Sequence, residues 1–227
     1  MLRSLVSRSA LVAGARRAVA AQGAGTADLR RDAWGHGLAD TARAMAAGGV
    51  RAVRVDGPAE VAELAALGLD ATHVGEPDLD PALIYGLPGS DGALRGEPAL
   101  RAVGRVLSTK DIEAGGGVSY GYIYRAPEDS RLALVTGGYA QGVVRALGNR
   151  AFVEIDGCRH RVVGRIAMDV CVVDIGDADV ALGADVTFFG GRGPLASGLA
   201  EWSTATGMTA GELVAVVGQR TERVWID

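Results

Sequence analysis

Cysteine, histidine and lysine are all scarce in this chain of 227 residues. Cys158 and Cys171 fit neither a CxxC pair nor a zinc cluster, so we expect a reducing cytosol and two core cysteines. The three histidines show no HxxxH or HxH spacing, which predicts no structural metal. Lys110 is the single lysine, so only one side-chain amine is present for chemistry that requires one.

An excess of positive charge and a long apolar run are also missing. The formal net charge is -4 and the isoelectric point is near 5.4, which provides no basic surface for DNA, RNA or anionic lipid. No apolar run approaches the roughly 18 residues of a membrane-spanning helix. We therefore expect a cytoplasmic protein with neither a nucleic-acid nor a membrane partner.

The first 27 residues contain several arginines and no acidic residue before Asp28. This composition is loosely similar to an organellar transit peptide. The simpler interpretation is an alanine-rich helix over residues 2–21 with its arginines on the solvent face.

A change of pattern near residue 98 divides the chain. Before it, the sequence predicts strands over residues 26–30, 50–55 and 71–74, with helices over 38–47 and 58–67 between them. This alternation predicts parallel strands joined by right-handed crossovers, as in an α/β barrel or an open doubly wound sheet. Residues 75–98, rich in Gly, Pro and Asp, are typical of an irregular connection.

Beyond residue 98, short runs of Val, Ile, Phe and Tyr alternate with turn signals and predict a mainly β region. The expected strands cover residues 101–109, 118–124, 131–136, 151–155, 159–163, 170–175, 185–189 and 224–226. Asp156-Gly157 predicts a tight hairpin, because both positions tolerate positive φ. Two short helices are expected over residues 199–206 and 210–217. The predicted domains are residues 1–98, α/β, and residues 99–227, mainly β.

Four short motifs follow one another in the β region: V-S-Y-G at residues 118–121, G-Y-A-Q-G at 138–142, Asn149-Arg150, and V-G-R-I-A-M-D at 163–169. They resemble V-S-Y-G, G-Y-A-D-G and V-G-R-x-C-M-D of the alanine racemase family. D-A-W-G-H-G at residues 32–37 is similar to the D-A-Y-G-H-G that follows the family's cofactor lysine. Tyr85-Gly86 is similar to the segment that closes the family's barrel.

The resemblance implies α/β plus β architecture: truncated TIM-barrel-like βα units followed by a mainly β alanine racemase C-terminal domain. A complete barrel of eight βα units takes about 250 residues, and fewer than 100 precede the β region here. We therefore expect an internally shortened barrel, whose exposed strand edges would favour oligomerisation.

The family reaction is the interconversion of L- and D-alanine with pyridoxal phosphate (PLP) as electron sink. The resemblance implies a Schiff-base lysine that acts as base on one face of Cα, and a tyrosine of the partner subunit on the other. It places Arg30, or Arg31 in an alternative alignment, at the lysine position. Arginine cannot form the Schiff base. Trp34 and Gly211 stand where the family has tyrosines that contact the cofactor.

Other family positions are retained. Tyr120 matches the catalytic tyrosine, and Tyr139, Met168 and Asp169 match substrate-binding positions. The resemblance therefore implies a homodimer, or a pairing with a related racemase, in which the site accepts a small amino acid. Without the resemblance, Tyr120 belongs to an aromatic strand face, Met168 is a core residue, and Asp169 forms a surface pair with Arg165.

Three hypotheses follow. The first is a racemase-like protein that is not self-sufficient as a catalyst, because Arg30 replaces the cofactor lysine. The second is an active PLP-dependent racemase that uses Lys110. The third is a non-catalytic binding module, in which the glycine-rich turn at residues 35–37 and His36 hold an anion; a solvent-facing His36 is the simpler expectation.

Overall fold

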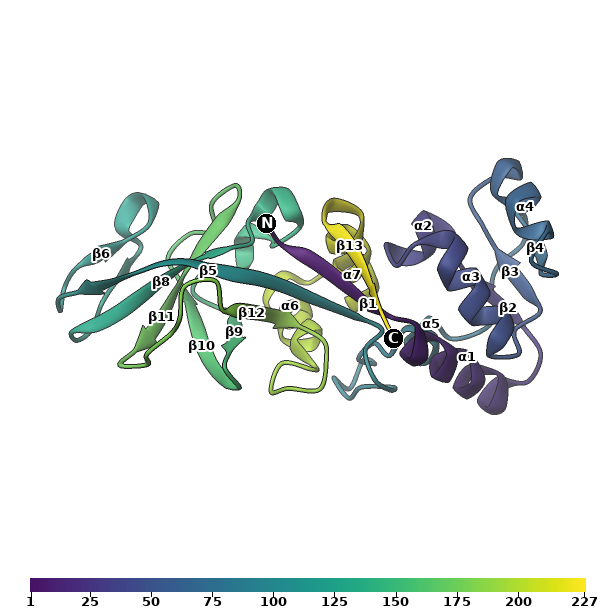
Figure 1. Ribbon diagram of the computed structural model, residues 1–227, viewed down its shortest axis with the longest axis horizontal. Coiled ribbons are helices and arrows are strands. Elements are labelled where there is room, and N and C mark those ends of the chain that lie inside the picture. The colour runs from purple at the N-terminus through teal and green to yellow at the C-terminus, as the bar shows by residue number, and fades with distance from the viewer.

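The two halves of the chain lie at opposite ends of an elongated molecule (Figure 1). The computed structural model describes residues 1–227. The eight-stranded sheet with the two helices of residues 198–220, called here the β part, occupies one end. The helices and three short strands of residues 8–85, called the α/β part, occupy the other. No helix combines the length and the apolar character needed to cross a bilayer.

The α/β part contains the strand and helix alternation that the sequence predicts. Its sheet has the order β2-β3-β4 and is parallel throughout. The strands are β2 (Thr26–Asp28), β3 (Ala52–Arg54) and β4 (Asp70–Thr72), with α2 (Arg30–Trp34) and α3 (Leu38–Ala47) before β3 and α4 (Pro58–Ala65) before β4. Pro58 opens α4 at a first-turn position that needs no N–H. The expected irregular connection carries one short helix, α5 (Pro81–Tyr85).

The β part is organised around a long strand, β5 (Leu100–Ile112), that pairs with three others. The sheet order is β12-β9-β10-β11-β8-β5-β1-β13, and β12 also pairs with β5, so the strands from β5 to β12 in this order close on themselves. They are β8 (Ser130–Thr136), β9 (Phe152–Ile155), β10 (Cys158–Val163), β11 (Val170–Gly176) and β12 (Asp185–Phe189). Asp156 and Gly157 have φ of 49° and 79°, and β9 pairs antiparallel with β10 across them, which confirms the predicted hairpin.

The N-terminus differs from the sequence prediction. Residues 3–7 form β1 (Arg3–Ser7), which pairs antiparallel with β5 and parallel with β13 (Glu222–Ile226), and α1 (Arg8–Gln22) follows. Leu2, Ser4 and Val6 are fully buried. Alternate burial against the sheet therefore overrides the helix propensity of this segment, and Ser7 caps α1 by accepting a hydrogen bond from the N–H of Ala10.

One expected strand is absent. Residues 118–124 form only the two-residue strands β6 (Gly117–Val118) and β7 (Tyr124–Arg125), separated by the 3₁₀ turn η1 (Tyr120–Tyr122). Ser119, Gly121 and Tyr122 have positive φ, a conformation that a strand cannot contain. Tyr120, Tyr122 and Tyr124 therefore do not share a strand face.

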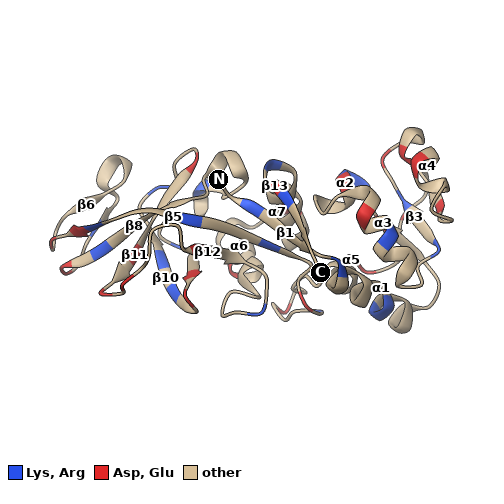
Figure 2. Cartoon of the chain, viewed as in Figure 1, with Lys and Arg blue, Asp and Glu red and all other residues tan.

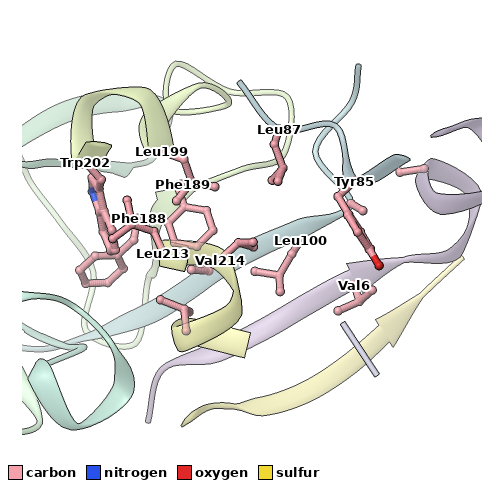
Figure 3. Packing of buried hydrophobic residues seen from close by; sticks show 14 of the residues in the cluster. Val6, Tyr85, Leu87, Leu100, Phe188, Phe189, Leu199, Trp202, Leu213 and Val214 are labelled. Atoms are coloured by element: carbon pink, nitrogen blue, oxygen red, sulfur yellow. The ribbon is translucent and has the colours of Figure 1, made fainter. Parts of the chain in front are cut away.

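One hydrophobic cluster of 47 buried residues joins the two parts (Figure 3), and a separate small cluster of three residues lies within the β part. Tyr85 of the α/β part and Val6 of β1 lie toward one side of the large cluster, and Phe189 packs edge-on against Trp202 of α6 (Gly198–Thr206) at 5.1 Å between ring centroids. Leu213 and Val214 bring α7 (Ala210–Arg220) into the same cluster.

The prediction of two core cysteines is half right. Cys171 on β11 is buried, and burial raises the pKa of its thiol to about 12. Cys158 is exposed, because it begins β10 directly after the hairpin turn.

Candidate functional site

The segment after β2 forms a left-handed turn. Arg31 to Trp34 have φ between 53° and 57°, although none of these residues is a glycine. Such a conformation stores on the order of 1–3 kcal/mol per residue and persists only when its surroundings hold it. Asp32 provides one support, since its carboxylate accepts the N–H of Leu38 at 2.7 Å and pairs with Arg223 of β13.

Arg30, which with Arg31 is one of the two residues that the resemblance places at the lysine position, is bound to Asp28 at the end of β2. Its Nε and Nη2 donate to the two carboxylate oxygens at 2.9 and 2.8 Å, and its backbone N–H donates to Oδ1 at 3.0 Å. Burial alone would raise the pKa of Asp28, but hydrogen bonds from Arg30 and Trp34 hold it below its ordinary value. The Arg30 guanidinium is thereby neutralised within the chain.

Three aromatic rings form a stack behind this pair. Tyr85 lies between Trp34 and His36, at 5.6 and 4.5 Å between centroids, and its hydroxyl donates to the Asp28 carbonyl at 2.7 Å. His36 is fully buried, with Nδ1 3.0 Å from the Ala33 carbonyl oxygen and no partner for Nε2. Burial lowers the pKa of His36 to about 4, so this side chain is neutral near pH 7.

The expectation of a solvent-facing His36 is therefore wrong. The glycine turn at residues 35–37 also leaves no room for an anion at Gly35. A Cβ placed on Gly35 would lie 2.8 Å from Cα of Gly218, which shows that α7 packs directly against this turn. Glycine is required at position 35 because of this close approach, and both Gly35 and Gly37 have positive φ.

An open cavity of about 460 Å³ lies between the end of β2, the end of β3 and the start of α7. We call it the arginine cavity. Its charged lining consists of Arg30, Arg31, Arg54, Asp28, Asp56 and Glu212. Both signs of charge are present around α2 and α3 in Figure 2. Four lining residues, Arg30, Arg31, Trp34 and Gly211, are positions that the resemblance singles out. Asp28 is not among them, although a carboxylate at the end of a buried parallel strand is a signal in the sequence.

Lys110 does not line the arginine cavity. It is exposed near the far end of β5, where the strand runs away from the α/β part (Figure 1), and it stands opposite Leu132 on β8. No lysine amine is therefore close to the turn that follows β2.

A second cluster lies in the β part, on the loops after β8 and β10. Tyr139 and Ala140 donate their backbone N–H groups to the carbonyls of Ala167 and Met168 at 3.0 and 2.9 Å. Gln141 donates to the Asp169 carboxylate at 2.8 Å and accepts the N–H of Gly138. The structure thus brings Tyr139, Met168 and Asp169 together, as their motif positions suggest.

Tyr120 projects from the neighbouring turn η1. Its side chain is 74% exposed, and Met168 is 55% exposed. The Ser119 hydroxyl donates to the Arg165 carbonyl at 2.9 Å, which ties η1 to the segment that carries Met168. The interpretations of Met168 as a core residue and of Asp169 as a partner of Arg165 are wrong, because Met168 is exposed and Asp169 is bonded to Gln141.

Comparisons with known proteins identify a family for the C-terminal part of the chain. A family model described as the alanine racemase C-terminal domain matches residues 99–225. The alanine racemase of Salinispora arenicola is 41% identical over 139 residues, which are 60% of this chain and 37% of that relative. By sequence, the chain thus spans less than two fifths of the length of this curated relative.

Solved structures of low sequence identity share the fold. An alanine racemase from a Streptomyces lavendulae that produces D-cycloserine superposes with a TM-score of 0.85 at 20% identity, covering 100% of this chain and 97% of that one. The alanine racemase of Bartonella henselae, described with covalently bound pyridoxal phosphate, gives 0.76 at 17% identity and covers 99% of both chains. Because the family model covers more than half of the chain, this protein belongs to the alanine racemase family.

Proposed function

We propose that this chain is an alanine-racemase-like protein that does not attach PLP and acts only when paired with a second racemase-fold subunit. The observation that carries the proposal is the arginine at position 30, just after β2, whose side chain is already bound to Asp28. The Arg30 guanidinium binds both oxygens of Asp28, and no lysine lines the arginine cavity. Residues 1–98 would then be a shortened barrel, and residues 99–227 the racemase-like C-terminal domain.

The residues present do not fit a covalently held PLP. The cofactor needs an amine that loses its proton near neutral pH, and a guanidinium stays protonated there. The bond to Asp28 raises the pKa of Arg30 further. Trp34 provides no hydroxyl at the position where the resemblance implies a tyrosine. No chemical step of this chain is therefore assigned to the cofactor.

The β part supports a role that the α/β part does not. Tyr120 and Met168 are both exposed, and the Ser119–Arg165 hydrogen bond joins the two segments that carry them. Tyr122 and Ile123, which follow Tyr120 in the chain, are 63% and 53% exposed. Tyrosine and methionine are enriched where proteins contact one another. We propose that this surface faces a partner subunit, with Tyr120 in the catalytic position and Tyr139, Met168 and Asp169 near the substrate.

The partner would be a second copy of the chain or a related racemase that carries the lysine. Only the second combination would contain both a cofactor lysine and Tyr120. The substrate of such a pair would be a small amino acid. The open edges of β2 and β4, each paired only with β3, give a further reason to expect association.

A rescue experiment tests this proposal. The Streptomyces lavendulae alanine racemase is made with phenylalanine at its position equivalent to Tyr120, and is mixed with this chain. We expect racemisation of alanine to be restored by the wild-type chain and by Tyr122→Phe, a matched change on the same turn, but not by Tyr120→Phe.

Two results would overturn the proposal. One is formation of D-alanine from L-alanine by the purified chain alone. The other is the absence of both rescue and a mixed complex in light scattering after size exclusion, at concentrations where each protein is folded.

A further inference from the structure

Trp34 lies directly on the backbone of Gly211 in the first turn of α7. A Cβ built on Gly211 would be 2.2 Å from Cζ3 of the indole and 3.0 Å from Cε3 and Cη2. Real carbon contacts are not this short, since carbon atoms pack at about 3.5–4.0 Å. Gly211 lies within α7 and has no positive φ. The indole, rather than the backbone conformation, therefore requires glycine at this position.

Other contacts hold the indole where it is. Tyr85 stacks on the ring at 22° between planes, and Tyr85 is itself fixed by its hydrogen bond to the Asp28 carbonyl. Trp34 also lines the arginine cavity beside Asp28 and contributes to the lowered pKa of that carboxyl group. Trp34 thus connects α7, the aromatic stack and the Arg30–Asp28 pair.

We infer that Trp34 and Gly211 are a coupled pair in which the indole fills the space of a side chain at position 211 and closes the inner end of the arginine cavity. This inference rests on the proposed function and extends it. The obstacle to cofactor attachment lies at two places, the guanidinium of Arg30 and the packing of Trp34. A lysine at position 30 would consequently not suffice to accept PLP.

The first consequence concerns packing and needs no cofactor. A double-mutant cycle of Gly211→Ala and Trp34→Ala isolates the coupling between the two positions. We expect Gly211→Ala to lower the urea midpoint clearly in the wild-type background and much less in the Trp34→Ala background. Gly57→Ala is the control, because its Cβ would meet nothing within 4 Å, and its effect should be equal in both backgrounds.

Equal effects of Gly211→Ala in the two backgrounds would overturn the coupled pair. The result is informative even if one variant is less stable, because every member of the cycle is compared by its unfolding midpoint. Circular dichroism of each variant before denaturation shows that the compared proteins are folded.

The second consequence concerns the cavity. Arg30→Lys and Arg30→Lys/Trp34→Tyr are mixed with PLP, reduced with borohydride and mapped by mass spectrometry. We expect a stoichiometric adduct at residue 30 in the double variant only. If the single variant Arg30→Lys already forms the adduct at residue 30, or if neither variant forms it, the role of Trp34 in closing the cavity is overturned. An adduct on the wild-type chain would instead overturn the proposed function, so the two failures are distinguishable.

Discussion

Arg30 and Trp34 of the α/β part are bonded or packed within the chain, whereas Tyr120 and Met168 of the β part face outward. Arg30 is held by Asp28, and Trp34 is packed on Gly211. Tyr120 and Met168 are exposed, on loops ordered by backbone hydrogen bonds and by the Ser119–Arg165 contact. Matching motifs therefore have unequal value. The guanidinium of Arg30 already has a partner within the chain, whereas the side chain of Tyr120 is accessible from outside.

The two parts also differ in how their sheets end, yet they share one core. The long sheet closes through the β12–β5 pairing, while the sheet of β2 to β4 has two unpaired edges. Buried residues of both parts belong to one hydrophobic cluster. We therefore expect a single cooperative unfolding transition rather than one for each part.

The largest expected effect comes from this core. Phe188→Ala should lower the free energy of unfolding by about 3–5 kcal/mol, since Phe188 is 1% exposed and packs against Trp202. Val53→Ala in the small sheet should lower it by about 1.5–3 kcal/mol. Urea titrations followed by circular dichroism should show one transition that moves in both variants. If Val53→Ala moves only a separate early transition, the two parts have independent cores.

The next effect is acid sensitivity from His36. Its pKa is lowered to about 4 in the fold, so the unfolded chain binds the proton more readily. Stability should therefore fall as pH decreases from about 6.5 to 4, by on the order of 3 kcal/mol for this group.

The measurement is urea unfolding across this pH range with His36→Asn, whose amide can still donate to the Ala33 carbonyl. The variant should lose that part of the acid dependence, whereas His73→Asn at the exposed His73 should keep it. Identical pH profiles for the wild-type chain and His36→Asn would contradict the buried neutral state.

A smaller effect is expected from Asp28→Asn, which leaves Arg30 with a neutral partner. A charged hydrogen-bonded pair of this kind contributes about 1.5–3 kcal/mol, and less where one partner is partly exposed, as Arg30 is. The folded pKa of Asp28 is lowered, so its contribution is present above the ordinary aspartate pKa and is lost as pH falls through the folded value.

The difference between Asp28→Asn and the wild-type chain should therefore shrink in acid. Asp91→Asn is the matched control, because Asp91 pairs with Arg95 in solvent, and this change should leave the unfolding midpoint within error. A difference for Asp28→Asn that stays constant down to strongly acidic pH would contradict the ionised pair.

The smallest effect on stability is expected at Tyr120. Tyr120→Phe removes a hydroxyl from a side chain that is 74% exposed, and the free energy of unfolding should change by less than about 0.5 kcal/mol. A clear loss of stability, measured by urea unfolding, would indicate that the hydroxyl has a structural role in the chain.

Much of the fold could be predicted from the sequence. Periodicity and turn residues gave the parallel strands, most strands of the β part and the Asp156-Gly157 hairpin. The segment around Tyr120 could not be predicted as a turn, because its aromatic alternation is typical of a strand while its backbone requires positive φ at Ser119 and Tyr122. The buried strand β1 was missed because helix propensity does not reveal a pairing partner that lies almost 100 residues further along the chain.

The candidate site was predictable as positions but not as contacts. The resemblance marked Arg30, Trp34 and Gly211 separately, and only the structure shows that the indole rests on Gly211 and that Asp28 binds Arg30. Burial of His36 was likewise invisible, since its glycine neighbours are equally typical of an exposed turn. The contact between Trp34 and Gly211 depends on helix α7, which lies far away in the sequence.

Borohydride trapping shows directly whether this chain attaches PLP. The purified wild-type chain is incubated with PLP, reduced with borohydride and digested, and modified residues are mapped by mass spectrometry beside a Lys110→Arg control. We predict no stoichiometric adduct at any residue. One adduct per chain at Lys110, absent from the control, would contradict the proposed function.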